Sequence, residues 1–399
     1  MTSLADYIKG MNANKVVLIT SLYPPFPEGV QQLWGGIEID MEDLVRSLRI
    51  YEIETTIISF HYIKPVENED EDGSIKRIGL YYPYLLGKSY KSTASFAYKE
   101  FFRPLIFLKL LKLLRKEKPD LVILGKTYQF SLAAYLACML LRVPYVVRYD
   151  WSCPTNPKSE LCTFWERFKC YKCVERITGM KISLIAKFTS SLYFPILFSL
   201  KSFFWNRSIK VLVVSEFYKR FTESFGVKSD KIEIIPPKSE LTFDLKVIDE
   251  LKRRYKADGE FILLYVGRLE PEKGIEILLG AFEHENLKKE KMKLLIAGMG
   301  RLVQLVKDAV KKDKRILYLG LVLHERIGNY FAIADLVVIP SVVPEGYGIV
   351  AEEAMSLNKP IIGFKLGALK EILGKYEQGI LVEELSVESL AKAIKRYAC

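Results

Sequence analysis

The stretch that decides the fold reads FILLYVGRLEPEKG and occupies residues 261–274. Its first six residues form an unbroken apolar run, which is typical of a parallel strand buried on both faces. A loop that begins and ends in glycine follows, and residues 274–282 have the apolar spacing of a helix. A strand, a glycine-containing loop and a helix begin a βαβ unit, so this stretch predicts a parallel α/β sheet.

The same alternation fills both halves of the chain. After residue 274 the pattern predicts further strands at 293–297, 315–319, 336–340 and 360–364. Before it, the pattern predicts strands at 15–20, 54–60, 119–124, 144–148 and 210–215. We therefore expect two Rossmann-like, doubly wound parallel sheets, in an N-terminal domain over residues 1–235 and a C-terminal domain over residues 240–399. Between them, IIPPKSE at 234–240 has the prolines and polar residues of a hinge.

Composition limits the class of protein. A chain of 399 residues that is 50% hydrophobic and 27% charged is globular, and its length suits two cores. The polar N-terminus does not have the pattern of a signal peptide, and six cysteines are too few for a secreted disulfide scaffold, so we expect a cytoplasmic protein. The net charge of +11 indicates anionic partners. Because Lys and Arg are spread along the chain without a nucleic-acid-binding motif, we expect phosphorylated substrates or an acidic membrane surface, and no nucleic acid.

Two carboxylates mark the first candidate site, in the stretch PEGYGIVAEEAM at 344–355. Glu345 falls in a glycine-containing loop, and Glu353 follows after seven intervening residues, about two turns into the next helix. Carboxylates accept hydrogen bonds from the paired hydroxyls of sugars and ribose, and the backbone N–H groups at a helix start can bind phosphate. The alternative is a solvated helix with glutamates at its N-terminal end.

Two cations mark the second candidate site, in the loop GRLEPEKG at 267–274. Arg268 follows the carboxyl end of a predicted strand and Lys273 precedes the next helix, which is where parallel sheets bind ligands. A planar guanidinium and a compact ammonium together suit a diphosphate. The alternative is two surface charges in a βα loop.

Together these segments resemble the C-terminal domain of the retaining family-4 glycosyltransferases. That family reads Gly-Arg-Leu, three residues, Lys-Gly, then Pro-Ser, then two glutamates separated by seven residues. Residues 267–274, Pro340-Ser341 and the pair Glu345 and Glu353 match this order. The first half looks similar too, at Tyr23-Pro24-Pro25, Gly35-Gly36 and 144–150, so the resemblance runs from about Lys15 to Val382.

The resemblance implies the GT-B fold, in which two Rossmann-like domains face each other across a cleft. It also implies roles for four side chains. Arg268 and Lys273 would neutralise the departing nucleoside diphosphate, as a divalent metal does in other transferases, so no cofactor is expected for catalysis. Glu345 would bind hydroxyls of the donor sugar, and Glu353 would bind the ribose.

Further family positions would contribute backbone groups. Tyr347 and Gly348 would place amides against the donor, and Gly35 and Gly36 would let the opposing domain approach the diphosphate closely. The implied activity is transfer of a sugar, with retention at the anomeric carbon, from a nucleotide-sugar donor to a lipid-linked or oligosaccharide acceptor.

The sequence departs from the family where a histidine usually follows the strand at 144–148. Tyr149-Asp150-Trp151 stands there, and the chain has only three histidines, none of them near this position. We expect Asp150 to take over this place in the catalytic site, because its carboxylate can accept hydrogen bonds from sugar hydroxyls. The alternative is a weaker activity without the histidine.

Four cysteines lie close together in the sequence, at Cys153, Cys162, Cys170 and Cys173. Four thiolates suit a tetrahedral structural zinc, and the arrangement resembles that of some family-4 members with similar cysteines. The alternative is four unlinked cysteines in a loop. Asp70 and Asp72 also form a DxD pattern, but they lie in an acidic run without a preceding apolar strand, so we expect a solvated loop and no catalytic metal.

An aromatic, apolar stretch at 183–205 is long enough to suggest a transmembrane helix. Lys187, Lys201 and a central Pro195 argue against a span, and the segment suits a membrane interface better, as does the basic helix at 101–116. The alternative is a pair of buried core helices. We expect peripheral attachment to the inner leaflet of the cytoplasmic membrane, next to a lipid-linked acceptor.

Two other functions remain open from the residues. One is a nucleotide-sugar epimerase or hydrolase of the same fold, which would act on the donor without an acceptor. The other is a membrane-associated partner subunit that keeps only binding. A dehydrogenase is disfavoured because no GxGxxG follows the first strand.

Overall fold

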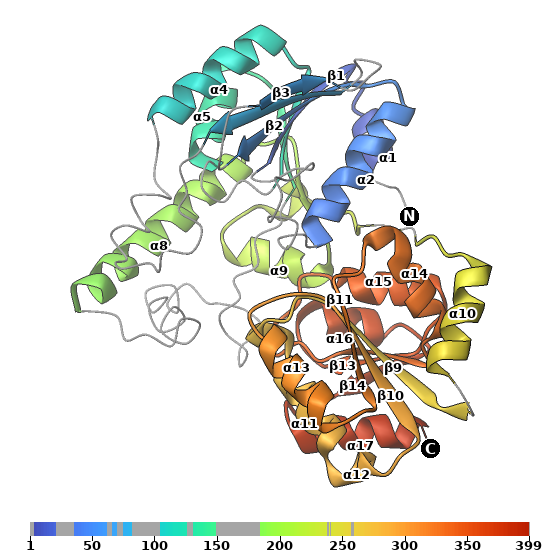
Figure 1. Cartoon of the computed structure of the whole chain (residues 1–399). Coiled ribbons are helices and arrows are strands. Elements are labelled where there is room, and N and C mark those ends of the chain that lie inside the picture. Colours follow the sequence, from blue (N-terminus) through green and yellow to red (C-terminus); the bar gives the residue numbers. More distant parts are fainter. Residues whose placement is uncertain are drawn as a thin grey trace. The chain divides into compact units, whose positions relative to one another are not determined.

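The computed structural model describes residues 4–20, 36–61, 66–69, 75–81, 104–125, 131–148, 184–237, 239, 241–256 and 259–398. The chain divides into two compact units: residues 1–27 and 37–237 are grouped in the first, and residues 28–36 and 238–399 in the second. Each unit has a sheet of its own with helices on both faces, which can be followed in Figure 1.

The first unit contains an eight-stranded sheet in the order β3-β4-β2-β1-β5-β6-β7-β8. Its strands are β1 (Lys15–Thr20), β2 (Glu54–His61), β3 (Val66–Glu69), β4 (Ile75–Tyr81), β5 (Leu121–Leu124), β6 (Tyr145–Arg148), β7 (Val211–Val213) and β8 (Ile232–Ile234). All neighbours pair in parallel except β3 and β4. The solvated loop predicted around Asp70 and Asp72 lies outside the described residues, whereas the residues just before it, Val66–Glu69, form this antiparallel edge strand by pairing with β4.

Helices cover both faces of this sheet because its strands are apolar on both sides. In β1, Val17 and Ile19 face one core, and Val16 and Leu18 face the other, as the two-residue period of a strand requires. The first core is closed by α4 (Pro104–Glu117), α5 (Ser131–Leu141), the end of α8 (Leu184–Trp205) and α9 (Glu216–Ser224). The second is closed by α1 (Leu4–Lys9) and α2 (Gly36–Ile50).

A buried ion pair ties α2 to the carboxyl end of β6. The side chain of Arg148 is only 1% exposed. It donates to both carboxylate oxygens of Asp40, at 2.9 and 3.1 Å, and to the carbonyl oxygen of Ile235 at 2.6 Å. Two parallel bonds to one carboxylate fix the guanidinium in a single geometry, so this pair holds α2, β6 and the end of β8 together.

The second unit contains a six-stranded, fully parallel sheet in the order β11-β10-β9-β12-β13-β14. Its strands are β9 (Phe261–Val266), β10 (Met292–Ala297), β11 (Ile316–Gly320), β12 (Leu336–Ile339), β13 (Ile361–Phe364) and β14 (Gly379–Val382). In chain order the strands run 3-2-1-4-5-6, which is the doubly wound Rossmann arrangement. The direction of winding reverses between β9 and β12.

Helices also cover both faces of the second sheet (Figure 1). One face carries α11 (Ile275–Glu283), α12 (Glu285–Lys288), α13 (Val303–Lys312) and α17 (Val387–Ala398). The other carries α10 (Leu245–Tyr255), α14 (His324–Ile333), α15 (Ile349–Ser356) and α16 (Gly367–Leu373). The predicted fold class, two doubly wound parallel α/β sheets, is therefore confirmed. The sequence missed short strands such as β8 and β14, which have too few residues for a clear period.

Candidate functional site

The carboxyl ends of β9, β12 and β13 lie side by side in the second sheet. Gly267 and Arg268 follow β9, Ser341 follows β12 by two residues, and Gly367 follows β13 by three. Because the winding direction reverses between β9 and β12, the helices that follow them, α11 and α15, pack on opposite faces of the sheet. This is the position at which doubly wound sheets bind ligands.

A close backbone contact brings the loop after β9 against the end of β12. Gly274 has a φ of +70°, and a Cβ built on it would lie 1.8 Å from the carbonyl oxygen of Pro340. The amide of Val342 donates to the carbonyl oxygen of Glu272 at 3.1 Å. Only glycine fits at position 274, and this fit places Lys273, which ends the short 3₁₀ turn Pro271–Lys273, beside the loop after β12.

Lys273 and Glu345 form the centre of the site. The Nζ atom of Lys273 donates to Oε1 of Glu345 at 2.5 Å, and the hydroxyl of Ser341 donates to the same oxygen. The Glu345 side chain is only 15% exposed. Burial raises the pKa of Glu345, but the nearby charge and hydrogen bond of Lys273, the hydroxyl of Ser341 and the charge of Arg268 outweigh it and hold that pKa below its usual value. Glu345 is therefore an ionised acceptor.

The second carboxylate oxygen of Glu345 is available to a ligand. Its Oε1 accepts both hydrogen bonds that the described residues donate to this side chain, and Oε2 accepts none from them. The backbone of the residue is also fixed, because the amide of Ala368 donates to its carbonyl oxygen at 2.9 Å. A Cβ at Gly367 would lie 2.7 Å from that oxygen, so the loop after β13 must approach through a glycine.

Arg268 lies at the edge of the same cluster. Its guanidinium is 46% exposed and pairs with Glu272 at 3.2 Å, while its backbone carbonyl accepts a hydrogen bond from the Tyr265 hydroxyl at 2.8 Å. Burial is the main cause that raises the pKa of the Tyr265 phenol, and the charge of Glu345 adds to it, so this phenol stays protonated as a donor. The structure thus brings three predicted residues together: Arg268, Lys273 and Glu345.

The helix that carries Glu353 begins at this site. Gly348 precedes α15 with a φ of +90°, and no side chain caps the helix. Uncapped N–H groups and the positive end of the helix dipole favour an anion there. The hydroxyl of Tyr347 donates to Glu352 at 2.8 Å, which orients the loop before the helix.

Glu353 lies in a second polar cluster on the same helix. Its side chain is 5% exposed, and its Oε1 atom contacts Ser239 at 3.1 Å and Nε2 of His324 at 3.0 Å. The sequence analysis did not assign a role to Ser239, His324 or Ser341. Ser341 belongs to the matched Pro-Ser pair and could have been assigned, whereas Ser239 lies 114 residues before Glu353 and gave no local signal.

The other predicted site residues lie at the start of α2 or outside the described residues. Gly36 is the first residue of α2. Gly35, Asp150 and the four cysteines at 153, 162, 170 and 173 lie outside the described residues. Within the described ranges, no group of three or more His, Cys, Asp or Glu side chains could hold a metal ion.

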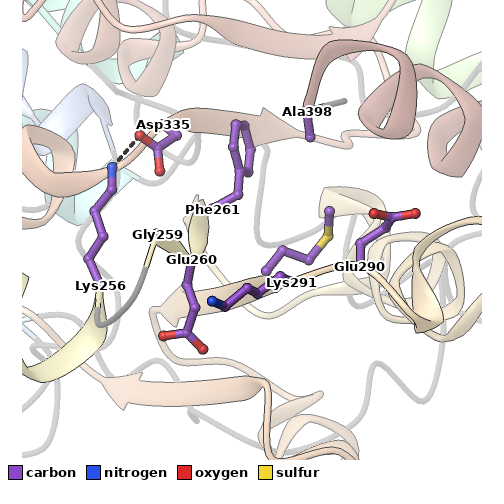
Figure 2. Close-up of a pocket in the computed structure, with 9 residues that line it drawn as sticks. Lys256, Gly259, Glu260, Phe261, Glu290, Lys291, Asp335 and Ala398 are labelled. Atoms are coloured by element: carbon purple, nitrogen blue, oxygen red, sulfur yellow. Dashed lines mark hydrogen bonds and ion pairs between the residues drawn. The ribbon is translucent and has the colours of Figure 1, made fainter.

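A surface pocket lies elsewhere in the second unit, where β9 and β10 begin (Figure 2). Figure 2 shows the Lys256 ammonium reaching Asp335, with which it forms an ion pair, and Phe261 nearby. This pocket is at the amino ends of the strands, whereas ligands of such sheets bind at the carboxyl ends. We therefore do not assign it to the site.

The fold and the site define a two-domain protein of the GT-B class, and comparison with known families agrees. Residues 34–237 match the model described as Glycosyltransferase Family 4, and residues 247–398 match the model described as Glycosyl transferases group 1. The chain belongs to glycosyltransferase family 4, and the resemblance noted from the sequence is confirmed.

Relatives with curated names are also named as sugar transferases. The chain is 30% identical over 200 residues to lipopolysaccharide 1,2-N-acetylglucosaminetransferase from Salmonella typhimurium, covering 47% of this chain and 52% of that protein. It is 30% identical over 151 residues to alpha-D-kanosaminyltransferase from Streptomyces kanamyceticus, covering 37% of this chain and 39% of that protein. The chain thus spans about half the length, or less, of these relatives.

Solved structures with the same fold cover nearly the whole chain. HepE from Anabaena, in complex with UDP and glucose, superposes with a TM-score of 0.64 at 16% identity and covers 96% of this chain and 89% of its own. WaaG, a glycosyltransferase involved in lipopolysaccharide biosynthesis, superposes with a TM-score of 0.60 at 14% identity, covering 96% and 90%. At these identities the likeness shows the fold.

Proposed function

We propose that this chain is a retaining glycosyltransferase that moves a sugar from a nucleoside-diphosphate-sugar donor to a lipid-linked or glycan acceptor. The observation that carries the proposal is the cluster of Lys273, Ser341 and Glu345 at the point where the second sheet reverses its winding. An ionised glutamate with one oxygen unoccupied accepts sugar hydroxyls, and the two cations beside it suit a diphosphate.

The donor would bind at the carboxyl end of the second sheet, against the loops after β9 and β12. Glu345 Oε2 accepts a hydroxyl of the donor sugar and fixes its orientation. Arg268 is exposed and can turn toward the diphosphate, and the uncapped start of α15 offers N–H groups to the same charge. Glu353 then lies further along the helix, where the ribose of the nucleotide would bind.

In the transfer step the bond between the anomeric carbon and the diphosphate oxygen breaks, and the acceptor oxygen forms a bond to the same face of that carbon. The acceptor proton passes to the leaving phosphate oxygen. Negative charge grows on the diphosphate in the transition state, and Arg268 and Lys273 are placed to stabilise it. These cations provide the charge that a metal would otherwise supply, so the reaction needs no cofactor.

The relatives and fold neighbours support this class of reaction. The Salmonella and Streptomyces relatives are named as sugar transferases, and the HepE structures hold UDP or UDP-glucose. The proposed donor class follows from these names and from the charge of the site, and the base and the sugar stay open.

A membrane-bound acceptor is supported by the surface of the first unit. One face of α4 is exposed and carries Leu105, Leu108, Lys109 and Lys112, which is the apolar and basic mixture of an interfacial helix. In the part of the chain that the structure describes, no helix is long and apolar enough to cross a bilayer. From the exposed apolar and basic face of α4 we propose peripheral attachment at the inner face of the cytoplasmic membrane.

The test is to incubate the purified protein with a panel of nucleotide sugars, with and without membrane lipid extract, and to measure the release of nucleoside diphosphate. Release that requires the extract and is lost in Glu345→Ala would support the transferase. Glu388→Ala serves as a matched control, because Glu388 is an exposed glutamate on α17 that pairs only with Lys392 among the described residues. Release without an acceptor would instead identify a hydrolase or epimerase, and binding without release would identify a non-catalytic subunit.

A further inference from the structure

A second polar cluster lies against the helix of the site, with Ser239 and Glu353 buried and His324 partly exposed, and it takes no part in the transfer step described above. Ser239 Oγ, His324 Nε2 and Glu353 Oε1 lie 3.0 to 3.1 Å from one another. They come from three separate segments: the stretch just after the division between the units, the first residue of α14 and the middle of α15. Tertiary packing has therefore assembled them.

The hydrogen positions follow from the chemistry of the three groups. An ionised carboxylate only accepts hydrogen bonds, so both Ser239 and His324 must donate to Oε1 of Glu353. Nε2 of His324 must carry a hydrogen, because its lone pair would otherwise face the carboxylate at 3.0 Å. One ring nitrogen faces both partners, so the cluster is not a Ser–His–acid relay, which uses the two nitrogens separately.

This arrangement leaves the other oxygen of Glu353 for a ligand. Oε2 makes no hydrogen bond to any residue that the structure describes, while two donors hold Oε1. A carboxylate held at one oxygen cannot rotate about its last bond without losing both hydrogen bonds. Its second oxygen therefore points in a fixed direction, which is what recognition of a single hydroxyl requires.

We infer that Ser239 and His324 are positioning residues that aim Glu353 Oε2 at a ribose hydroxyl of the nucleotide, and that this pair determines the preference for ribonucleotides over deoxyribonucleotides. The inference rests on the proposed function, since it assigns the ribose end of the same donor. Ser239 lies in the hinge stretch and His324 is the first residue of α14, so both lie outside the two matched sequence motifs.

The experiment measures affinity by calorimetry with the whole chain. UDP, ADP, GDP and CDP are titrated first, and the tightest is then compared with its 2′-deoxy and 3′-deoxy forms. We expect His324→Ala and Ser239→Ala each to weaken binding of the ribonucleotide about tenfold, as loss of a hydrogen bond to a charged group does. Binding of the affected deoxy form should change little, so the preference for ribose should shrink by the same factor.

Conservative variants and a control separate positioning from general damage. His324→Gln and Ser239→Thr each keep a donor, so they should restore most of the preference for ribose. His284→Ala is the matched control, because the side chain of His284 accepts only the Asn286 amide near α12 in the described structure, and the variant should leave all affinities unchanged. Thermal unfolding without ligand reports whether each variant is folded.

The outcomes are distinct. If the alanine variants weaken ribo and deoxy forms equally, or leave both unchanged, the positioning inference is wrong while the proposed function stands. If the unmodified protein binds none of the nucleoside diphosphates, the proposed function is wrong and this inference fails with it.

Discussion

Replacing Lys273 with methionine should lower the stability of the second unit and also the turnover of the protein. The first effect comes from the loss of the ion pair with Glu345, and the second from the loss of the cation at the leaving group. Methionine keeps most of the volume and removes the charge, so Glu345 would be left mostly buried and without its cation. Removing one partner of a buried pair costs about 3 to 5 kcal/mol, and the partial exposure of both side chains reduces this to about 2 kcal/mol. For a unit of this size, that corresponds to a fall in Tm of about 4 to 8 °C.

The loss of stability in Lys273→Met should be larger at neutral pH than at acidic pH. In the unmodified protein the pKa of Glu345 is lowered on folding, so the pair stabilises the fold above the unfolded pKa and this contribution is lost as pH falls through the folded pKa. In the variant, burial dominates and raises that pKa. The difference in stability should therefore be largest at neutral pH and above, begin to shrink as pH falls through the raised pKa of Glu345 in the variant, and shrink further below about pH 4.3, the unfolded value.

The assay is urea unfolding from pH 4 to 8 together with nucleoside diphosphate release. The double variant Lys273→Met/Glu345→Gln has no uncompensated charge, so it should recover most of the lost stability. It should still lack the cation at the leaving group, and turnover should stay about 100-fold down or more. Equal stability of Lys273→Met and the unmodified protein at pH 7 would refute the reasoning, as would a double variant less stable than the single one.

Four further predictions concern other parts of the chain. Gly274→Ala should unfold the second unit at least 10 °C earlier in calorimetry, because its Cβ would lie 1.8 Å from a carbonyl oxygen; an unchanged Tm would contradict that contact. Arg148→Met should cost about 3 kcal/mol in urea unfolding, since its carboxylate partner on α2 stays buried, and replacing that carboxylate as well should recover part of the loss. Charge reversal at Lys109 and Lys112 should reduce the fraction of protein that sediments with phosphatidylglycerol vesicles at low salt. An unchanged fraction would show that α4 does not bind the membrane. The cysteines between Cys153 and Cys173 should hold one equivalent of zinc by elemental analysis of the purified protein, and the absence of stoichiometric metal would reject that site.

The sequence by itself determined the fold class and predicted the main residues of the candidate site. Apolar runs such as FILLYV predict buried parallel strands, because a strand covered on both faces has no polar side. Loop residues directly after such a strand, such as Arg268, are placed by the chain itself at its carboxyl end. The glutamate pair and Lys273 followed from the order of motifs along the chain.

Only the tertiary structure decided which side chains meet. Lys273 and Glu345 are 72 residues apart, and Ser239 and Glu353 are 114 apart. Their contacts depend on β9 and β12 being neighbours in the sheet and on α14 and α15 packing on one face. A local pattern records the period of an element and the turn that ends it, but it does not record which elements become neighbours. That choice is made when the faces of all strands and helices are buried together, so the partners of Glu345 and Glu353 became visible only in the folded chain.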